Sequence, residues 1–226
     1  MNWMKKVAVA LVCLLPLGLQ AAKVDTLQVK SPSMNKSIEV VVVSPDVAVT
    51  KACPVIYLLH GYGGNARTWV GIKPDLSKIA DEKGIFFVCP DGKNTWYWDS
   101  PLNADVRYET FISDELVKYV DSHYKTVADR KGRAITGLSM GGHGAMWNGL
   151  RHSDVFSAAG STSGGVDIRP FPKNWEMSVQ IGEKAKYPEN WEKYTVINLV
   201  PTLRKDQIAL IFDCGDSDFF LEVNKN

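Results

Sequence analysis

Residues 133–145 read RAITGLSMGGHGA and contain a GxSxG motif at Gly137-Leu138-Ser139-Met140-Gly141. The residues before the serine are typical of a short strand, and we expect a helix to begin directly after it. A serine on so sharp a turn projects its hydroxyl out of the fold, while the flanking glycines let neighbouring backbone approach closely. The helix N-terminus beyond Ser139 also favours negative charge. The stretch therefore predicts a nucleophile elbow in which Ser139 is the catalytic nucleophile.

Strands and helices are predicted to alternate on both sides of this elbow. Strand-like apolar runs lie at residues 38–43, 55–59, 85–89, 134–137 and 208–212, and helical patterns lie at 75–83 and 110–124. Runs that are apolar almost throughout are typical of strands covered on both faces. Their alternation with helices predicts an α/β domain around a mostly parallel sheet. Residues 24–29 and 38–43 are expected to form an antiparallel hairpin at one edge of that sheet.

Length and charge restrict the class of protein. The chain has 226 residues, 45% of them hydrophobic, with 26 Lys and Arg against 25 Asp and Glu. That length corresponds to one domain of ordinary size, and the apolar content is sufficient for a core, which argues against disorder. The even charge balance argues against a nucleic-acid partner, because a polyanionic backbone calls for a basic face.

The segment 1–22 is predicted to be a secretory signal peptide. Lys5 and Lys6 precede an apolar run from Val7 to Leu19 that ends in Gln20-Ala21-Ala22. A basic start, a short apolar centre and small residues at its end are typical of a cleaved signal. The run is shorter than the ~20 apolar residues that span a bilayer. We therefore expect a secreted or periplasmic protein with no stable membrane anchor, whose single domain covers residues 23–226.

The cysteines indicate neither a disulfide framework nor a metal site. Cys53, Cys89 and Cys214 follow the predicted signal, and an odd number cannot pair fully within one chain. Each lies beside an apolar run, so we interpret them as small buried residues. The sequence has no CxxC or histidine-rich spacing typical of a zinc site, and we expect no metal and no cofactor.

A second glycine-rich segment, His60-Gly61-Tyr62-Gly63-Gly64, follows the predicted strand at 55–59. In hydrolases with a nucleophile elbow, the loop in this position supplies one backbone N–H to the oxyanion hole, and the residue after the nucleophile supplies the other. These donors are predicted to be Tyr62 and Met140, with Gly61 as the alternative for the first. His60 is then expected to brace the loop.

An acidic segment, Asp213-Cys214-Gly215-Asp216-Ser217-Asp218, follows the predicted strand at 208–212. Hydrolases of this type carry serine, acid and histidine in that order along the chain, so an acid in this position fits the second place. Order alone leaves the three aspartates open as candidates, because aspartate is also common in turns.

These segments together resemble the esterase-D-type branch of the α/β-hydrolases, which includes S-formylglutathione hydrolases, feruloyl and acetyl esterases and mycolyltransferases. The resemblance lies in residues 58–64 with Trp69, 90–92 with Trp96-Tyr97, 137–145, and 214–219. It implies an α/β-hydrolase fold, a mostly parallel central sheet flanked by helices. It also implies that Asp218 is the triad acid, and that Asp91 and Trp96 line the cleft and bind substrate.

The sequence departs from the family pattern in its histidines. His60, His123, His143 and His152 all precede Asp218, whereas the family carries its catalytic histidine after the acid, on a loop beyond one more helix and strand. His143 matches a family histidine that is not part of the triad. We therefore expect a C-terminally incomplete fold without the last strand, last helix and histidine loop. The 226-residue chain is expected to be nearly inactive and poorly folded when expressed as it stands.

Residues 164–206 are predicted to be an insertion between two strands. They are rich in proline, tryptophan and charge, with only broken helical periodicity. A long polar and aromatic insertion is uncommon in a compact domain unless it has a function, so a pocket wall is favoured over a plain surface excursion. Trp175 and Trp191 in it, like Trp96 and Trp98, could stack on sugar rings or could belong to the core.

The combined hypothesis is a serine carboxylic-ester hydrolase that acts through an acyl-enzyme with a Ser-Asp-His triad. The expected substrate is an acetyl or feruloyl ester of a plant polysaccharide or oligosaccharide, because an exported enzyme meets extracytoplasmic esters. Two alternatives remain open: an acyltransferase of the mycolyltransferase type, and a non-catalytic carbohydrate-binding relative that has lost its histidine.

Overall fold

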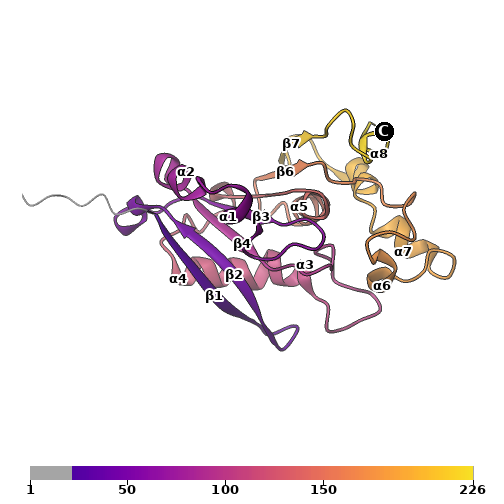
Figure 1. Ribbon diagram of the computed structural model, residues 1–226, viewed down its shortest axis with the longest axis horizontal. Helices are drawn as coiled ribbons and strands as arrows, with labels where there is room; N and C mark the ends of the chain where they lie inside the picture. Colours follow the sequence, from indigo (N-terminus) through magenta and orange to yellow (C-terminus); the bar gives the residue numbers. More distant parts are fainter. Residues whose placement is uncertain (1–21, 226) are drawn as a thin grey trace, which may run out of the picture.

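The computed structural model of the chain describes residues 22–225, so the predicted signal peptide, apart from its last residue, lies outside the described residues. Residues 22–225 form a seven-stranded sheet in the order β1-β2-β4-β3-β5-β6-β7 (Figure 1). The strands are β1 (Lys23–Ser31), β2 (Lys36–Ser44), β3 (Val55–Leu59), β4 (Phe86–Pro90), β5 (Arg133–Gly137), β6 (Ala158–Thr162) and β7 (Ala209–Asp213).

The strand directions confirm the predicted α/β class. β1 and β2 form an antiparallel hairpin, and β2 pairs antiparallel with β4. From β4 onward every neighbouring pair, β4–β3, β3–β5, β5–β6 and β6–β7, is parallel. The sheet is therefore mostly parallel with the hairpin at one edge, as the strand pattern predicts.

Helices cover both faces of the sheet (Figure 1). The α-helices are α1 (Thr68–Ile72), α2 (Leu76–Lys83), α3 (Tyr108–Thr110), α4 (Leu116–His123), α5 (Met140–Arg151), α6 (Met177–Ile181), α7 (Pro188–Lys193) and α8 (Leu221–Asn224). Side chains of β2 alternate between two buried clusters, since successive residues of a strand point to opposite faces. Val40 and Val42 pack in the cluster that contains α4 and α5. Val41 and Val43 pack with α1 and α2 in the other cluster.

The helix predicted at 110–124 is present, but it is not a single regular α-helix. It is formed by α3, a turn of π-helix at Phe111–Glu115, and α4. Within this segment the Ser113 hydroxyl donates to the Glu109 carbonyl at 2.7 Å. A hydroxyl bonded one turn back competes with the regular backbone ladder, and single π-turns of this kind interrupt otherwise ordinary helices.

At the other edge of the sheet, β6 was absent from the strand pattern, whereas β7 coincides with the strand predicted at 208–212. β6 is a short strand of small residues, Ala-Ala-Gly-Ser-Thr, held between β5 and β7. β7 is the edge strand of the described sheet, and Leu210, Ile211 and Phe212 are exposed on it. β7 is therefore the least covered strand among residues 22–225.

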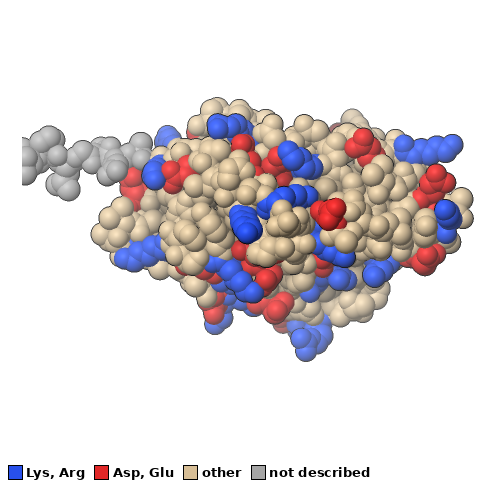
Figure 2. All heavy atoms as spheres, turned by 90° about the horizontal axis from the view of Figure 1, so that it is seen from below, with Lys and Arg blue, Asp and Glu red and all other residues tan. Residues whose placement is uncertain are grey.

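The surface has no broad area of one charge on the face in Figure 2, where basic and acidic side chains are interspersed. Within the described part of the chain, no helix has the length and apolar character needed to cross a bilayer.

Two fully buried tyrosines provide a test of this core. The Tyr57 hydroxyl has no hydrogen-bond partner within the described residues, whereas the Tyr97 hydroxyl donates to the His60 carbonyl at 3.0 Å. Both side chains are 0% exposed. Because an orphan buried hydroxyl opposes folding, Tyr57→Phe should raise the free energy of unfolding by about 1 kcal/mol. Tyr97→Phe, the matched variant, should lower it by about 1 kcal/mol. Urea unfolding measures both, and equal losses in the two variants would contradict the prediction.

Candidate active site

Ser139 occupies a strained turn between the end of β5 and the start of α5. Its backbone has φ 53° and ψ −119°, a region that side chains rarely adopt. The turn is held by hydrogen bonds, since the Ser139 N–H donates to the Thr162 carbonyl at 2.9 Å and the His143 N–H donates to the Ser139 carbonyl at 3.0 Å. Backbone hydrogen bonds therefore hold the half-buried Ser139 at the carboxyl edge of the sheet.

The glycines of the motif are required by close packing. A Cβ atom on Gly141 would lie 2.2 Å from the Leu59 carbonyl oxygen, and one on Gly137 would lie 2.3 Å from the Gly141 carbonyl oxygen. Real Cβ atoms do not approach backbone so closely, so no other residue fits either position without displacement of β3 or α5. The first turn of α5 therefore rests directly on the end of β3.

The predicted oxyanion loop lies against this elbow. A Cβ atom on Gly61 would be 3.5 Å from the Ser139 Cβ, so the loop after β3 and Ser139 are neighbours. Among residues 22–225, the N–H groups of Tyr62 and Met140 have no hydrogen-bond acceptor. Met140 also begins α5, whose N-terminus favours a negative charge. These features agree with two unengaged donors beside Ser139, while the assignment of Tyr62 and Met140 as those donors stays a prediction.

His60 supports the loop after β3 from the interior of the fold. Its Nε2 accepts the Gly92 N–H at 2.9 Å, so that nitrogen carries no proton. Nδ1 is then protonated and donates to the Gly61 carbonyl at 2.7 Å. The imidazole is buried and both nitrogens are engaged. His60 therefore supports the loop through both of its ring nitrogens, and it is not available as a general base.

A second support of the loop comes from Asn94 and Glu176, which the sequence analysis did not identify. The Gly63 N–H donates to the Asn94 Oδ1 at 2.9 Å, and the Asn94 Nδ2 donates to the Glu176 Oε2 at 3.2 Å. Partial burial, with a hydrogen bond to and repulsion from Glu176, raises the pKa of the Tyr62 hydroxyl. Three separate loops meet here, so no spacing in the sequence could have indicated the contact.

Asp218 lies at the same edge of the sheet as Ser139. The two residues follow β7 and β5, which are parallel and separated only by β6. The Asp218 Oδ1 accepts the Phe220 N–H at 2.7 Å, and the other carboxylate oxygen has no partner within the described residues. Asp213 is engaged differently, because its Oδ2 accepts the Thr162 hydroxyl at 3.2 Å. Asp218 thus keeps an oxygen free to orient a base, and its triad role remains a prediction.

The remaining histidines are engaged away from Ser139. The His143 Nδ1 lies 2.8 Å from the Gly165 carbonyl, and its Nε2 accepts the Trp98 Nε1–H at 3.1 Å. Burial lowers the pKa of His143 to about 4, against the opposing effect of the bond to Gly165. His152 contacts the Glu109 carboxylate at 2.8 Å, and His123 stacks on Tyr119. Among the described residues, no histidine ring forms a hydrogen bond with the Ser139 side chain, and the one contact of His143 with Ser139 is through the backbone.

The two predicted cleft residues, Asp91 and Trp96, are both buried but lie in different surroundings. Asp91 follows β4, and its carboxylate binds the Lys93 ammonium at 2.6 Å and the Lys93 N–H at 2.9 Å. Burial would raise the pKa of Asp91, but the contacts with His60 and Lys93 hold it below its ordinary value. Trp96 is only 1% exposed, stacks on Trp98 and donates to the Trp175 carbonyl at 3.0 Å. Aromatic rings enclose the Trp96 ring in this structure, and its role in substrate binding stays a prediction.

The insertion at 164–206 lies beside the loop that bears Asp218. Trp175 stacks on Phe219 with ring centroids 5.4 Å apart, and its ring is 5.2 Å from that of Phe220. Trp191, in contrast, is fully buried, with its Nε1 donating to the Gly182 carbonyl. Of the two insertion tryptophans, Trp175 is the one near the candidate site, while Trp191 belongs to the core.

No cluster of three or more histidine, cysteine, aspartate or glutamate side chains within residues 22–225 could hold a metal ion. The groups that the structure brings together at this edge are the Ser139 hydroxyl, backbone N–H donors and the Asp218 carboxylate.

Comparisons with known proteins agree with this architecture. The model of the family described as "Putative esterase" matches residues 31–226. An esterase of Mycobacterium tuberculosis is 35% identical over 123 residues, which cover 51% of this chain but only 26% of that protein. An acetyl esterase of Caldicellulosiruptor saccharolyticus is 25% identical over 189 residues, 76% of this chain and 68% of that protein.

Solved structures are similar over most of the chain. A ferulic acid esterase structure is 30% identical, with a TM-score of 0.73, over 91% of this chain and 84% of the other. An S-formylglutathione hydrolase from Agrobacterium tumefaciens has the same fold, with a TM-score of 0.73 and 23% identity, over 89% and 78% of the two chains.

The support from Asn94 can be tested without an activity assay. Asn94→Ala removes the acceptor of the Gly63 N–H, so hydrogen exchange in residues 61–65 should become about tenfold faster, as expected for the loss of about one hydrogen bond. Asn103→Ala is the matched control, because Asn103 accepts the Asp105 N–H in another turn. Unchanged exchange in residues 61–65, or the same change in both variants, would exclude this role of Asn94.

Proposed function

The chain belongs to this esterase family, and we propose that it is a carboxylic-ester hydrolase whose acyl-enzyme forms on Ser139. One observation carries the proposal: the strained turn at Ser139 lies against a braced glycine loop, and two N–H groups beside it have no acceptor among the described residues. A fixed pair of donors next to a nucleophile is the arrangement that stabilises the oxyanion of acyl transfer.

In the proposed mechanism, the Ser139 Oγ attacks the ester carbonyl and the oxyanion accepts hydrogen bonds from the N–H groups of Tyr62 and Met140. A base oriented by Asp218 removes the serine proton and returns it to the leaving alcohol, after which water releases the acyl group. His60 and His143 cannot be that base, because both nitrogens of each ring are engaged. In a serine protease the loss of the histidine costs about 10⁶ in rate.

A base supplied from solution therefore tests the mechanism. The 226-residue chain should hydrolyse an aryl acetate very slowly, and added imidazole should raise the rate above the reaction of imidazole alone. Peptide mass spectrometry should locate the acetyl group on Ser139. Ser139→Ala should abolish both signals, whereas Ser122→Ala, at an exposed serine near the end of α4, should leave them unchanged. Acylation that persists in Ser139→Ala would refute the mechanism. If Ser139 is never acylated, the non-catalytic alternative is favoured.

The proposed substrate is an acetyl or feruloyl ester of a plant polysaccharide or oligosaccharide, met outside the cytoplasm. Three observations support it: the predicted signal peptide, the similarity to an acetyl esterase, and the similarity to a ferulic acid esterase structure. The insertion beside Asp218, with Trp175 against Phe219, is proposed as the wall that receives the acyl group.

Acyl preference tests this proposal. In the imidazole-assisted assay, feruloyl and acetyl esters of xylo-oligosaccharides should acylate Ser139 at least about tenfold faster than a butyrate ester of a simple alcohol, since about 1.4 kcal/mol of extra binding to the sugar produces such a ratio. A preference for the simple aliphatic ester, with no effect of the sugar, would refute the substrate while leaving the esterase mechanism intact. Transfer of the acyl group to an added sugar in place of water would favour the acyltransferase alternative.

A further inference from the structure

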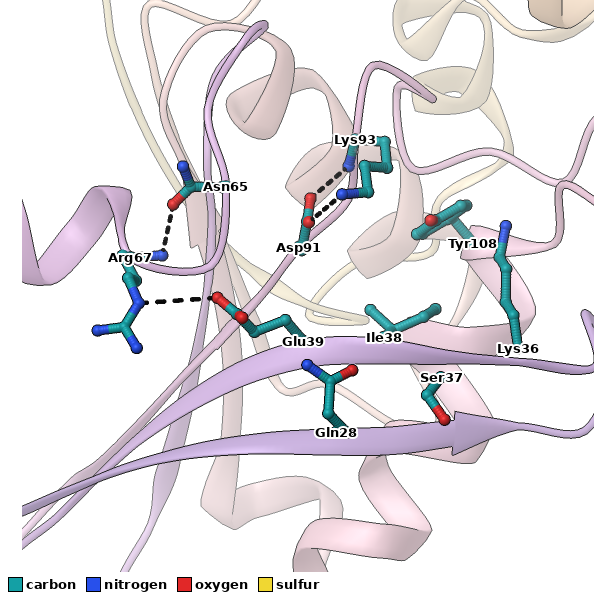
Figure 3. Close-up of a pocket in the computed structure, with 10 residues that line it drawn as sticks. All are labelled: Gln28, Lys36, Ser37, Ile38, Glu39, Asn65, Arg67, Asp91, Lys93 and Tyr108. Carbon is teal, nitrogen blue, oxygen red and sulfur yellow. Dashed lines mark hydrogen bonds and ion pairs between the residues drawn. The ribbon is translucent and has the colours of Figure 1, made fainter.

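A polar cavity of about 440 Å³ lies at the end of β4, apart from the groups that carry the proposed chemistry. Figure 3 shows its lining, which comes from the hairpin β1–β2, the loop after β3, the turn after β4 and α3. Four separate segments therefore line the cavity, and Asp91 is the one lining residue that the family resemblance had indicated.

The cavity forms because strand β2 of the hairpin extends beyond the end of its neighbour β4. Val40 of β2 pairs with Pro90 at the end of β4, and the Asp91 N–H still donates to the Glu39 carbonyl at 2.9 Å. Residues 36–38 of β2 continue beyond this point and pair only with β1. The overhanging hairpin forms one wall outside the carboxyl end of β4. Ligands of α/β sheets bind outside the carboxyl ends of the strands.

The cavity and the candidate oxyanion hole share two loops. Tyr62 and Arg67 belong to the same loop after β3, and five residues of chain span at most about 17 Å. The Gly63 N–H is bonded to Asn94, which directly follows Lys93 in the wall of the cavity. A substrate with several sugar rings can therefore place its ester at Ser139 and a distant ring in the cavity.

The charges in the cavity are unequal. Each of its two carboxylates faces one cation: Glu39 lies 3.8 Å from the Arg67 Nε, and Asp91 lies 2.6 Å from the Lys93 Nζ. Lys36 is the third cation, and within residues 22–225 it forms no ion pair with a cavity carboxylate. Its ammonium donates to the Asp105 carbonyl at 3.2 Å and lies 5.0 Å from the centre of the Tyr108 ring. The residues that line the cavity thus carry one positive charge in excess, while the Asp105 carboxylate attracts Lys36 from outside the lining.

The position of Lys36 favours an anion. Partial burial lowers the pKa of Lys36, and repulsion from Lys93 lowers it further, against the attraction of Asp105. Two ammonium groups that repel one another are stabilised when a carboxylate lies near both. The carboxylates and amides of the remaining lining provide acceptors and donors for hydroxyl groups, as sugar recognition requires.

We propose that this cavity binds an acidic sugar, a uronate ring of the oligosaccharide or polysaccharide whose ester is cleaved at Ser139. The uronate carboxylate lies between Lys36 and Lys93, and its hydroxyl groups reach the carboxylates of Asp91 and Glu39. This inference rests on the proposed function, because that function identifies the ligand as a sugar that carries an ester. It makes the substrate class more specific: an acidic polysaccharide is preferred to a neutral one.

Binding to the Ser139→Ala chain tests the inference independently of catalysis. In calorimetry at low salt, a glucuronate-bearing xylo-oligosaccharide should bind about tenfold more tightly than a neutral xylo-oligosaccharide of equal length, as expected for one charge-assisted contact. The difference should shrink at higher ionic strength, because the cavity is open to solvent and its charges are screened.

Two lysine variants on the same hairpin identify the contact. Lys36→Met keeps the aliphatic stem beside Tyr108 and should abolish the preference for the acidic sugar. Lys30→Met is the matched control, because Lys30 is exposed on β1 and does not line the cavity. Equal affinity for the two sugars, or the same effect of both variants, would overturn the inference. Acidic-sugar binding without acylation of Ser139 would refute the proposed function alone, whereas acylation without the preference would refute the cavity assignment alone.

Discussion

The close contact between the first turn of α5 and the end of β3 is the constraint on which the candidate site depends. Gly141 packs so tightly on the Leu59 carbonyl that a Cβ atom would lie 2.2 Å from the oxygen. The chain can reach this position only by a sharp turn, which holds Ser139 at φ 53°. Strain of this kind costs about 1–3 kcal/mol and persists because the surrounding structure enforces it. Here the parallel neighbour β6 does so, through the bond from Ser139 to Thr162.

The loop after β3 is fixed from two sides against this turn. His60 ties it to the segment after β4 from inside the fold, and Asn94 ties Gly63 to the same segment near the surface. Hydrogen-bond donors that are already oriented need no rearrangement as charge develops, which is the main advantage of an oxyanion hole over water. The same two loops also form walls of the cavity at the end of β4. The proposed reaction and the proposed recognition of a distant sugar ring therefore depend on the same pair of loops.

Sequence patterns predicted the strands and helices that are specified by residues close together in the chain. They missed those that depend on contacts with distant segments. The strand at 55–59 coincides with β3, and the edge hairpin, α2 and the start of α5 lie where apolar periodicity and the glycine motif predict them. β6 was missed because its small residues have little strand preference, and pairing on both edges makes it a strand. Aromatic rings from distant segments also enclose Trp96 in the structure.

The amino-acid sequence was sufficient for the α/β class and for the strand-turn-helix around Ser139, and it provided the order of the predicted nucleophile and acid along the chain. Each of these depends on residues close in sequence, such as glycines at a sharp turn or apolar side chains at a regular spacing. Only the tertiary structure decided that His60 and His143 are engaged supports, that Asn94 and Glu176 hold the oxyanion loop, and that Lys36 faces a cavity. These properties depend on groups brought together by the sheet, because hydrogen bonding, burial and charge are set by neighbours in space.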